Sequence, residues 1–194
     1  MRKLILTFIT VLFIDTIITP FAEAETVTPT QAANQYGYNV SESYQPEGAV
    51  NVAQTGQLLY QYNMNKKWYP ASMTKLMTMY LTLDAVNKGE LSLNDKVKIT
   101  DTHYRMSTLP ELSNTKLYPG ETYTVKELLQ ITVSNSSNAA ALILGKEVSG
   151  NLSDFTDKMN KKAKALGMEN THFVNPTGAE NHQLRDFVPK KYKS

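Results

Sequence analysis

The chain has 194 residues, of which 41% are hydrophobic and 20% charged, with a net charge of +2 and no cysteine. This length suits one domain with its own core. The near-neutral charge argues against a nucleic-acid-binding surface, and the lack of cysteine excludes disulfides and thiol catalysis.

The first 24 residues have the pattern of a secretory signal peptide. Arg2 and Lys3 give a positive start, Leu4–Ile14 is mostly apolar, and Ala22-Glu-Ala24 offers a small-residue cleavage site. The apolar run is too short for a stable membrane span. We therefore expect an exported protein whose mature chain begins near Glu25.

A β-hairpin is predicted before the centre of the chain. After a possible short helix at 31–36, the β-prone runs Ala49–Ala53 and Gln57–Tyr62 flank a turn at Gly56. The hairpin leads through a second polar turn and Pro70 into a long helix.

Ser72 and Lys75 lie three positions apart at the start of that helix, so they share one face. A serine hydroxyl becomes a nucleophile when a base takes its proton. A lysine can be that base if burial or the positive end of a helix lowers its pKa. The pair is therefore a candidate acyl-transfer site, and the alternative is a serine at a helix start with a solvated lysine. The helix pattern after the pair is amphipathic, with apolar positions at Leu76, Met79, Tyr80, Leu83 and Val86.

The same spacing recurs at Ser113 and Lys116, so spacing alone is weak support. No apolar periodicity follows this second copy, which lies between Pro110 and Pro119. We interpret it as part of a long loop over 101–120, after a strand or irregular segment at 91–100.

The remaining elements are mostly helical. Thr124 and Glu127 form a capping box for a short buried helix. After a polar stretch at 134–138, an apolar helix over 139–148 ends at Gly150, and an amphipathic helix spans 153–166. Residues 175–178 form a turn. The pattern indicates an α-rich α+β fold with little sheet.

Ser136 and Asn138 belong to the polar stretch between two apolar helices, where buried polar groups need partners. The other Ser-x-Asn matches, at 92–94 and 149–151, lie in a polar turn and at a helix end. One interpretation places Ser136 against Lys75 as a proton relay, with the Asn138 amide on a peptide substrate. The alternative is an ordinary turn that caps the next helix.

Three motifs together carry a family resemblance: Pro70-Ala-Ser-Met-Thr-Lys75, Ser136-Ser-Asn138 and Thr171–Gly178. With these motifs in this order behind a signal peptide, the chain resembles the low-molecular-mass penicillin-binding proteins, the serine D-Ala-D-Ala carboxypeptidases. The resemblance runs through essentially the whole chain and is strongest to staphylococcal members. It implies a β-lactamase/transpeptidase-like α+β fold, with residues 25–194 as the N-terminal part of the catalytic domain.

The resemblance also implies the chemistry. Ser72 would attack the penultimate D-Ala carbonyl of a peptidoglycan stem peptide, with Lys75 as general base. Ser136 would pass a proton to the departing D-Ala, and Asn138 would position the substrate. Water or an amine of another strand would then release the acyl-enzyme, whereas a β-lactam would stay bound. The implied location is the outer face of the cytoplasmic membrane or the cell wall.

No cofactor or metal is expected. The three histidines, at positions 103, 172 and 182, lack metal-ligand spacing.

One family motif is absent, because no Lys-Thr-Gly or Lys-Ser-Gly occurs in this chain. In the family this motif lies on a strand that lines the cleft and supplies an oxyanion N–H. The sequence thus resembles an N-terminal piece that lacks the C-terminal sheet strands, and any anchor would lie beyond Ser194. We expect this chain alone to be inactive, since losing one oxyanion donor costs about 10²–10³ in turnover.

Two alternatives remain open. A class A-like β-lactamase shares the Ser-x-x-Lys helix but has Ser-Asp-Asn and a deacylating glutamate. Here Ser137 stands in the middle of the second motif, and Glu111 is the carboxylate to examine. The other alternative is a non-catalytic envelope protein that binds peptidoglycan or β-lactams. A Ser-His-Asp hydrolase is disfavoured, because no Gly-x-Ser-x-Gly elbow occurs.

Overall fold

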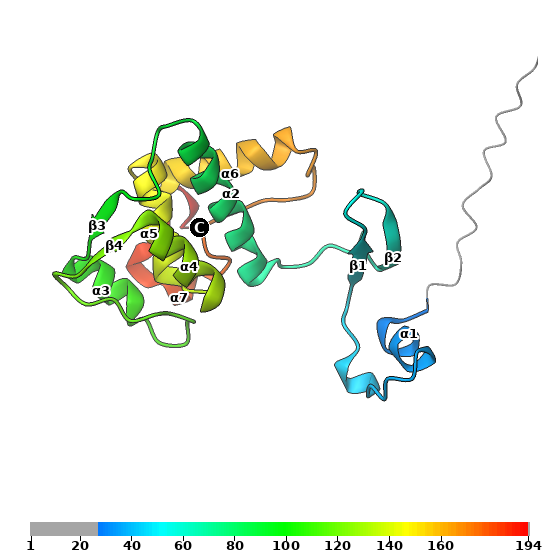
Figure 1. The fold of residues 1–194 in the computed structure, drawn as a ribbon. Coiled ribbons are helices and arrows are strands. Elements are labelled where there is room, and N and C mark those ends of the chain that lie inside the picture. The colour runs from blue at the N-terminus through cyan, green and yellow to red at the C-terminus, as the bar shows by residue number, and fades with distance from the viewer. Residues whose placement is uncertain (1–26, 194) are drawn as a thin grey trace, which may run out of the picture. The chain divides into compact units, whose positions relative to one another are not determined.

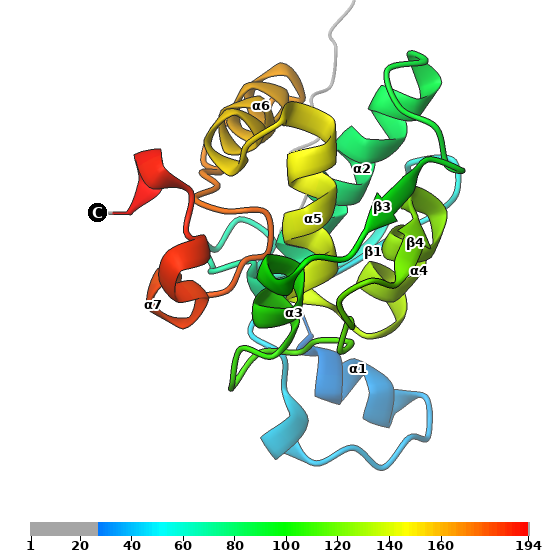
Figure 2. The ribbon, with the colours of Figure 1, turned by 90° about the vertical axis from the view of Figure 1, so that its left-hand side faces the viewer.

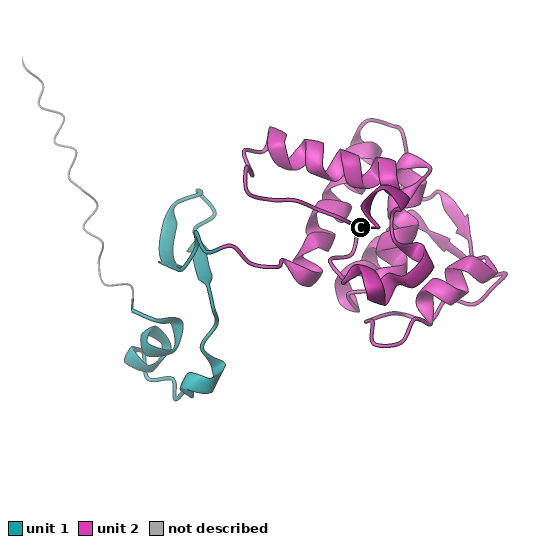
Figure 3. Ribbon diagram, turned by 180° about the vertical axis from the view of Figure 1, so that it is seen from behind, with its two compact units in different colours: residues 1–66 teal, residues 67–194 magenta. Residues whose placement is uncertain are grey.

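The computed structural model describes residues 27–193, which divide into two compact units. The first unit ends at Lys66 and the second begins at Lys67 (Figure 3). The predicted signal peptide at 1–24 lies outside the described residues. The assignment of 25–194 to part of one catalytic domain stays a prediction.

The first unit holds the predicted hairpin. Its two strands pair antiparallel, with Ala49 opposite Tyr62, and Gly56 adopts a φ of +85° in the turn between them. Only glycine reaches that conformation without strain, so the turn residue fits the prediction, which is confirmed. The elements of this unit are α1 (Pro29–Gln35), the 3₁₀ turn η1 (Glu42–Tyr44), β1 (Ala49–Val52) and β2 (Leu58–Tyr62) (Figure 1).

The second unit is mainly helical and carries the candidate site. A second antiparallel pair, β3 with β4, lies within it; the sequence analysis did not predict β4. The elements are η2 (Ala71–Met73), α2 (Thr74–Asn87), β3 (Lys96–Lys98), α3 (Asp101–Ser107), β4 (Thr122–Thr124), α4 (Val125–Ser134), α5 (Asn138–Ser149), α6 (Leu152–Ala165), α7 (Asn181–Leu184), η3 (Arg185–Phe187) and η4 (Lys190–Tyr192).

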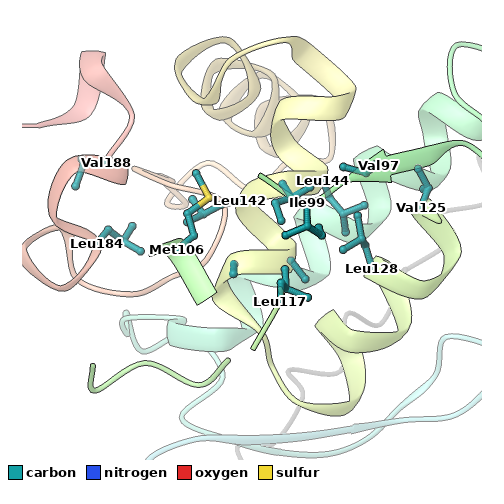
Figure 4. Close-up of a cluster of buried hydrophobic side chains, with 13 residues drawn as sticks. Val97, Ile99, Met106, Leu117, Val125, Leu128, Leu142, Leu144, Leu184 and Val188 are labelled. Atoms are coloured by element: carbon teal, nitrogen blue, oxygen red, sulfur yellow. The ribbon is translucent and has the colours of Figure 1, made fainter. Parts of the chain in front are cut away.

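Helix α5 is the centre of the second unit, as Figure 2 shows. Its residues from Asn138 to Gly145 are all buried, and it packs against α2, α3, α4 and α6. A helix that is apolar on every side is stable only inside a core. At Gly145 a side chain would meet the Phe155 ring at 2.9 Å, so α5 and α6 approach closely there. The main core cluster includes Ile99, Leu117, Leu128, Leu142, Leu144 and Leu184 (Figure 4).

The predicted loop over 101–120 is wrong in its first part, because Asp101–Ser107 form α3. The hydroxyl of Thr100 accepts the backbone N–H of His103, and the His103 ring accepts the N–H of Thr100. This is a capping box in which histidine replaces the usual glutamate or glutamine, so the sequence signal was missed. The capping box at Thr124 and Glu127 was predicted and is confirmed.

The predicted apolar face of α2 is also wrong. Leu76 and Leu83 of that stripe are 63% and 45% exposed. The hydroxyl of Thr78 donates to the Pro176 carbonyl at 2.7 Å, and that of Thr82 donates to the Thr78 carbonyl at 2.8 Å. Because these hydroxyls have partners, a polar-looking face can be buried. The buried residues of α2 are Thr74, Lys75, Met77, Thr78, Leu81, Thr82 and Ala85.

Candidate active site

Ser72 lies in the 3₁₀ turn η2, directly before α2. The preceding Ala71 has a φ of +45°, a left-handed conformation that a residue with a side chain keeps only where its surroundings hold it. Lys75 follows in the first turn of α2, and its Nζ donates to Ser72 Oγ at 3.1 Å. The two side chains face each other, as their spacing predicted.

Lys75 is buried, with 3% of its surface exposed. Besides Ser72, its amine donates to the Thr177 carbonyl at 2.9 Å. Burial lowers the pKa of Lys75 from 10.5 to about 8, because the charged form loses hydration. Roughly a tenth of the amine is then neutral at pH 7, so it can accept a proton.

Ser136 completes the surroundings of the Ser72 hydroxyl. It lies in the bend between α4 and α5 with a φ of +51°, and its Oγ donates to Ser72 Oγ at 2.9 Å. Within residues 27–193 no hydrogen bond joins Ser136 directly to Lys75; both side chains donate to Ser72 Oγ, and the relay between them stays a prediction. The next residue, Ser137, is the cap of α5, as its hydroxyl accepts the Ala140 N–H.

Asn138 is the first residue of α5 and is 4% exposed. Its backbone N–H and its side-chain Nδ2 both donate to the Ser113 carbonyl, at 3.0 Å and 2.9 Å. Asn138 therefore anchors Ser113, and the segment around Ser113 lines the same cleft as Ser72. The sequence analysis assigned Asn138 to the substrate, and that role stays a prediction.

A cleft of about 870 Å³ opens at Ser72. This size is typical of sites for drug-sized ligands and short peptides. Asn138 and Glu111 lie in its walls, and Glu111 has a φ of +66°. The other walls include Tyr69, Pro70, Leu112, Phe173, Val174 and Glu180.

The turn at 175–178 is a part of the site that sequence reasoning recognised only as a turn and a family motif. The Thr177 carbonyl is the second acceptor of the Lys75 amine. The bond joins a backbone atom to a residue about one hundred positions earlier in the chain, so no local pattern marks it. The run of Asn, Pro and Gly in this turn was the available signal.

The second Ser-x-x-Lys copy, Ser113 and Lys116, does not form a second Ser–Lys pair at the site. Ser113 contributes its backbone carbonyl to Asn138, whereas Lys116 lies over the rings of Tyr104 and Tyr118, at 5.6 Å and 5.1 Å. The interpretation of this copy as loop is confirmed.

Two further properties concern only the residues that the structure describes. Among them, no group of three or more His, Asp or Glu side chains is placed to hold a metal ion. Over the same range, no helix is both long and apolar enough to cross a membrane.

Comparison with known proteins identifies the class. The family model described as D-alanyl-D-alanine carboxypeptidase matches residues 45–192. The D-alanyl-D-alanine carboxypeptidase DacF of Bacillus subtilis is 41% identical over 155 residues, which are 79% of this chain and 39% of that protein. This chain therefore spans well under half of that relative's length.

Solved structures agree on the fold. A peptidoglycan synthesis regulatory factor, PBP3 of Streptococcus pneumoniae, superposes with a TM-score of 0.69 at 36% identity, over 74% of this chain and 40% of that chain. Penicillin-Binding Protein D2 of Listeria monocytogenes, in its ampicillin-bound form, superposes with a TM-score of 0.56 at 35% identity, over 69% and 51%.

The predicted α+β fold is confirmed as part of a transpeptidase-like fold, the fold of the penicillin-binding proteins. The chain belongs to the D-alanyl-D-alanine carboxypeptidase family. The stronger resemblance to staphylococcal members stays a prediction.

Proposed function

We propose that this chain carries the nucleophile of a serine-type D-Ala-D-Ala carboxypeptidase or transpeptidase that acts on peptidoglycan stem peptides. The observation that carries this proposal is the pair of hydrogen bonds at Ser72 Oγ, from Lys75 at 3.1 Å and from Ser136 at 2.9 Å. The name of the Bacillus relative supports the substrate class, and the ampicillin-bound Listeria protein supports β-lactams as ligands.

In the proposed acylation step, the neutral Lys75 amine takes the proton of the Ser72 hydroxyl. Ser72 Oγ then attacks the penultimate D-Ala carbonyl and forms a tetrahedral intermediate. As the C–N bond to the terminal D-Ala breaks, its nitrogen receives a proton through Ser136, and Asn138 holds the peptide. The product is an ester between Ser72 and the shortened stem peptide.

In the second step, water attacks the ester in the carboxypeptidase reaction, or an amine of another strand attacks it in the transpeptidase reaction. A β-lactam carbonyl would be attacked in the same way. Its leaving nitrogen stays tethered to the acyl group, so the adduct persists. The proposed chemistry needs no metal or cofactor, and a peptidoglycan substrate supports a location outside the cytoplasmic membrane, at its outer face or in the cell wall.

The test is acylation of Ser72. The chain is incubated with a fluorescent penicillin, and the labelled residue is identified by peptide mass spectrometry. Slow label on Ser72 is expected, because the nucleophile and its base are present although this chain alone is expected to lack turnover; the label should be lost in Ser72→Ala and kept in the neighbouring control Ser134→Ala. Label that persists in Ser72→Ala, or no label at saturating penicillin, would contradict the proposal. Rapid stoichiometric labelling would support it but refute the separate expectation that this chain alone is inactive.

A second candidate function is that of a class A-like β-lactamase. It is favoured by Glu111, because Glu111 lines the same cleft as Ser72. That candidate requires fast hydrolysis of a chromogenic cephalosporin, lost in Glu111→Gln. The carboxypeptidase proposal expects a long-lived adduct instead. For a protein that only binds peptidoglycan or β-lactams, Ser72→Ala would leave ligand affinity unchanged.

A further inference from the structure

The turn at 175–178 is built around one buried amide. Asn175 is 1% exposed, and its Oδ1 accepts three hydrogen bonds, from the Thr177 N–H, the Thr177 hydroxyl and the Gly178 N–H, at 2.8–2.9 Å. Its Nδ2 donates to the Ala179 carbonyl at 2.9 Å. A single side chain therefore fixes the backbone of the whole turn.

One hydrogen bond to α2 and one close approach to the preceding turn η2 hold the turn in place. The Pro176 carbonyl accepts the hydroxyl of Thr78, which lies three positions after Lys75 on α2. Gly178 has a φ of +76°, and a Cβ there would lie 1.8 Å from the Ala71 carbonyl oxygen. The turn is thus held against α2 at Pro176 and against η2 at Gly178.

Between these contacts, the Thr177 carbonyl points at the Lys75 amine, at 2.9 Å. We propose that Asn175 is a positioning residue for the reaction, because it fixes the carbonyl that aims the Lys75 amine at Ser72. The inference rests on the proposed function and adds a residue to it. Asn175 lines the same cleft as Ser72, but within residues 27–193 no hydrogen bond joins it to Ser72 or to the Lys75 amine, so its proposed action runs through the turn.

The geometry explains how this helps catalysis. A neutral amine has two N–H donors and one lone pair. When one N–H is used by Thr177, rotation of the amine is restricted and the lone pair can be directed at the Ser72 hydroxyl. The turn also covers the amine, and burial is what lowers the pKa of Lys75 to about 8.

The experiment measures the Lys75 amine directly and the reaction separately. The amine is titrated by NMR of the chain made with ¹³Cε-labelled lysine, its signal identified by its loss in Lys75→Met. In Asn175→Ala the apparent pKa is expected to rise by about one unit or more toward 10.5, because a loosened turn admits water. The rate of acylation by penicillin should fall about 10- to 100-fold, with the half-saturating concentration unchanged.

A matched control is Thr82→Val, one turn further along α2, whose hydroxyl donates to the Thr78 carbonyl of the same helix. It should change neither the titration nor the rate. If Asn175→Ala does not fold, Thr78→Val decides, since it removes only the hydroxyl bond to Pro176. A folded Asn175→Ala, or in its place Thr78→Val, with wild-type titration and rate would overturn the inference. If wild-type Ser72 is never acylated, the proposed function fails, while the titration still decides the role of Asn175 in holding the amine.

Discussion

The reactivity proposed for Ser72 depends on groups that carry no negative charge. The acceptors of the Lys75 amine are a serine hydroxyl and a backbone carbonyl. A carboxylate beside the amine would stabilise the ammonium and raise the pKa of Lys75. With neutral acceptors, burial dominates and the pKa falls to about 8, which is near the pH at which a general base is most effective.

The first prediction concerns this base. The rate of Ser72 acylation should increase with pH, reach half of its maximum, the midpoint, near pH 8 and level off above that, since only the neutral amine accepts a proton. Lys75→Met should lower the rate by about 10²–10⁴ and remove this midpoint. The matched control is Lys116→Met, from the second Ser-x-x-Lys copy, which should leave the profile unchanged. The measurement is the labelling rate between pH 6 and 10, and a wild-type profile in Lys75→Met would contradict it.

At the scale of elements, the site is assembled where helices begin and turns meet them. Ser72 precedes α2, Ser136 and Asn138 lie at the start of α5, and the turn at 175–178 packs on α2. Helix starts expose unpaired backbone N–H groups, so they favour polar side chains and bends of this kind.

The second prediction concerns Gly178, where the backbone conformation and the neighbouring Ala71 carbonyl leave no room for a side chain. Gly178→Ala would strain the left-handed backbone, which costs about 1–2 kcal/mol, and would collide with the Ala71 carbonyl oxygen at 1.8 Å. Gly167→Ala has a similar φ of +74° with nothing within 4 Å of a Cβ, so it isolates the backbone strain. Gly178→Ala should therefore lower the free energy of unfolding by about 1–3 kcal/mol more than Gly167→Ala. Equal losses in denaturant unfolding would contradict the collision.

The sequence predicted elements whose signals are local. The hairpin around Gly56, the cap at Thr124 and the helix that ends at Gly150 are each marked by neighbouring residues. The face of α2 was mispredicted because the partner of Thr78 is the carbonyl of residue 176, far away in the chain. The same reason hid the bond from Lys75 to Thr177, whereas the Ser72–Lys75 pair was predictable from its spacing together with the helix pattern that follows it.

At the scale of the whole molecule, the two units differ in how much core they contain. The second unit has buried clusters around α5 and between α2 and α6. In the first unit, the hairpin side chains Val50, Val52, Leu58 and Leu59 are 43–58% exposed. An isolated two-stranded hairpin is marginally stable in water, so stability is concentrated in the second unit.

The third prediction follows from this division. Residues 67–194 produced alone should fold with one cooperative thermal transition, close to that of the full 194-residue chain, since their core is their own. Phe155→Ala in this shorter chain should lower the free energy of unfolding by about 3–5 kcal/mol, because Phe155 is fully buried. Loss of the cooperative transition on removing residues 1–66 would show that the second unit needs the first.

In the proposed reaction, the neutral surroundings of Lys75 also matter after the Ser72 proton has moved to its amine. The Thr177 carbonyl dipole steadies the new ammonium, but less strongly than a carboxylate would. The proton is therefore held loosely enough to be handed on when the departing nitrogen needs it. In the proposed reaction, a lysine held in this way would serve first as proton acceptor and then as proton donor within a single cycle.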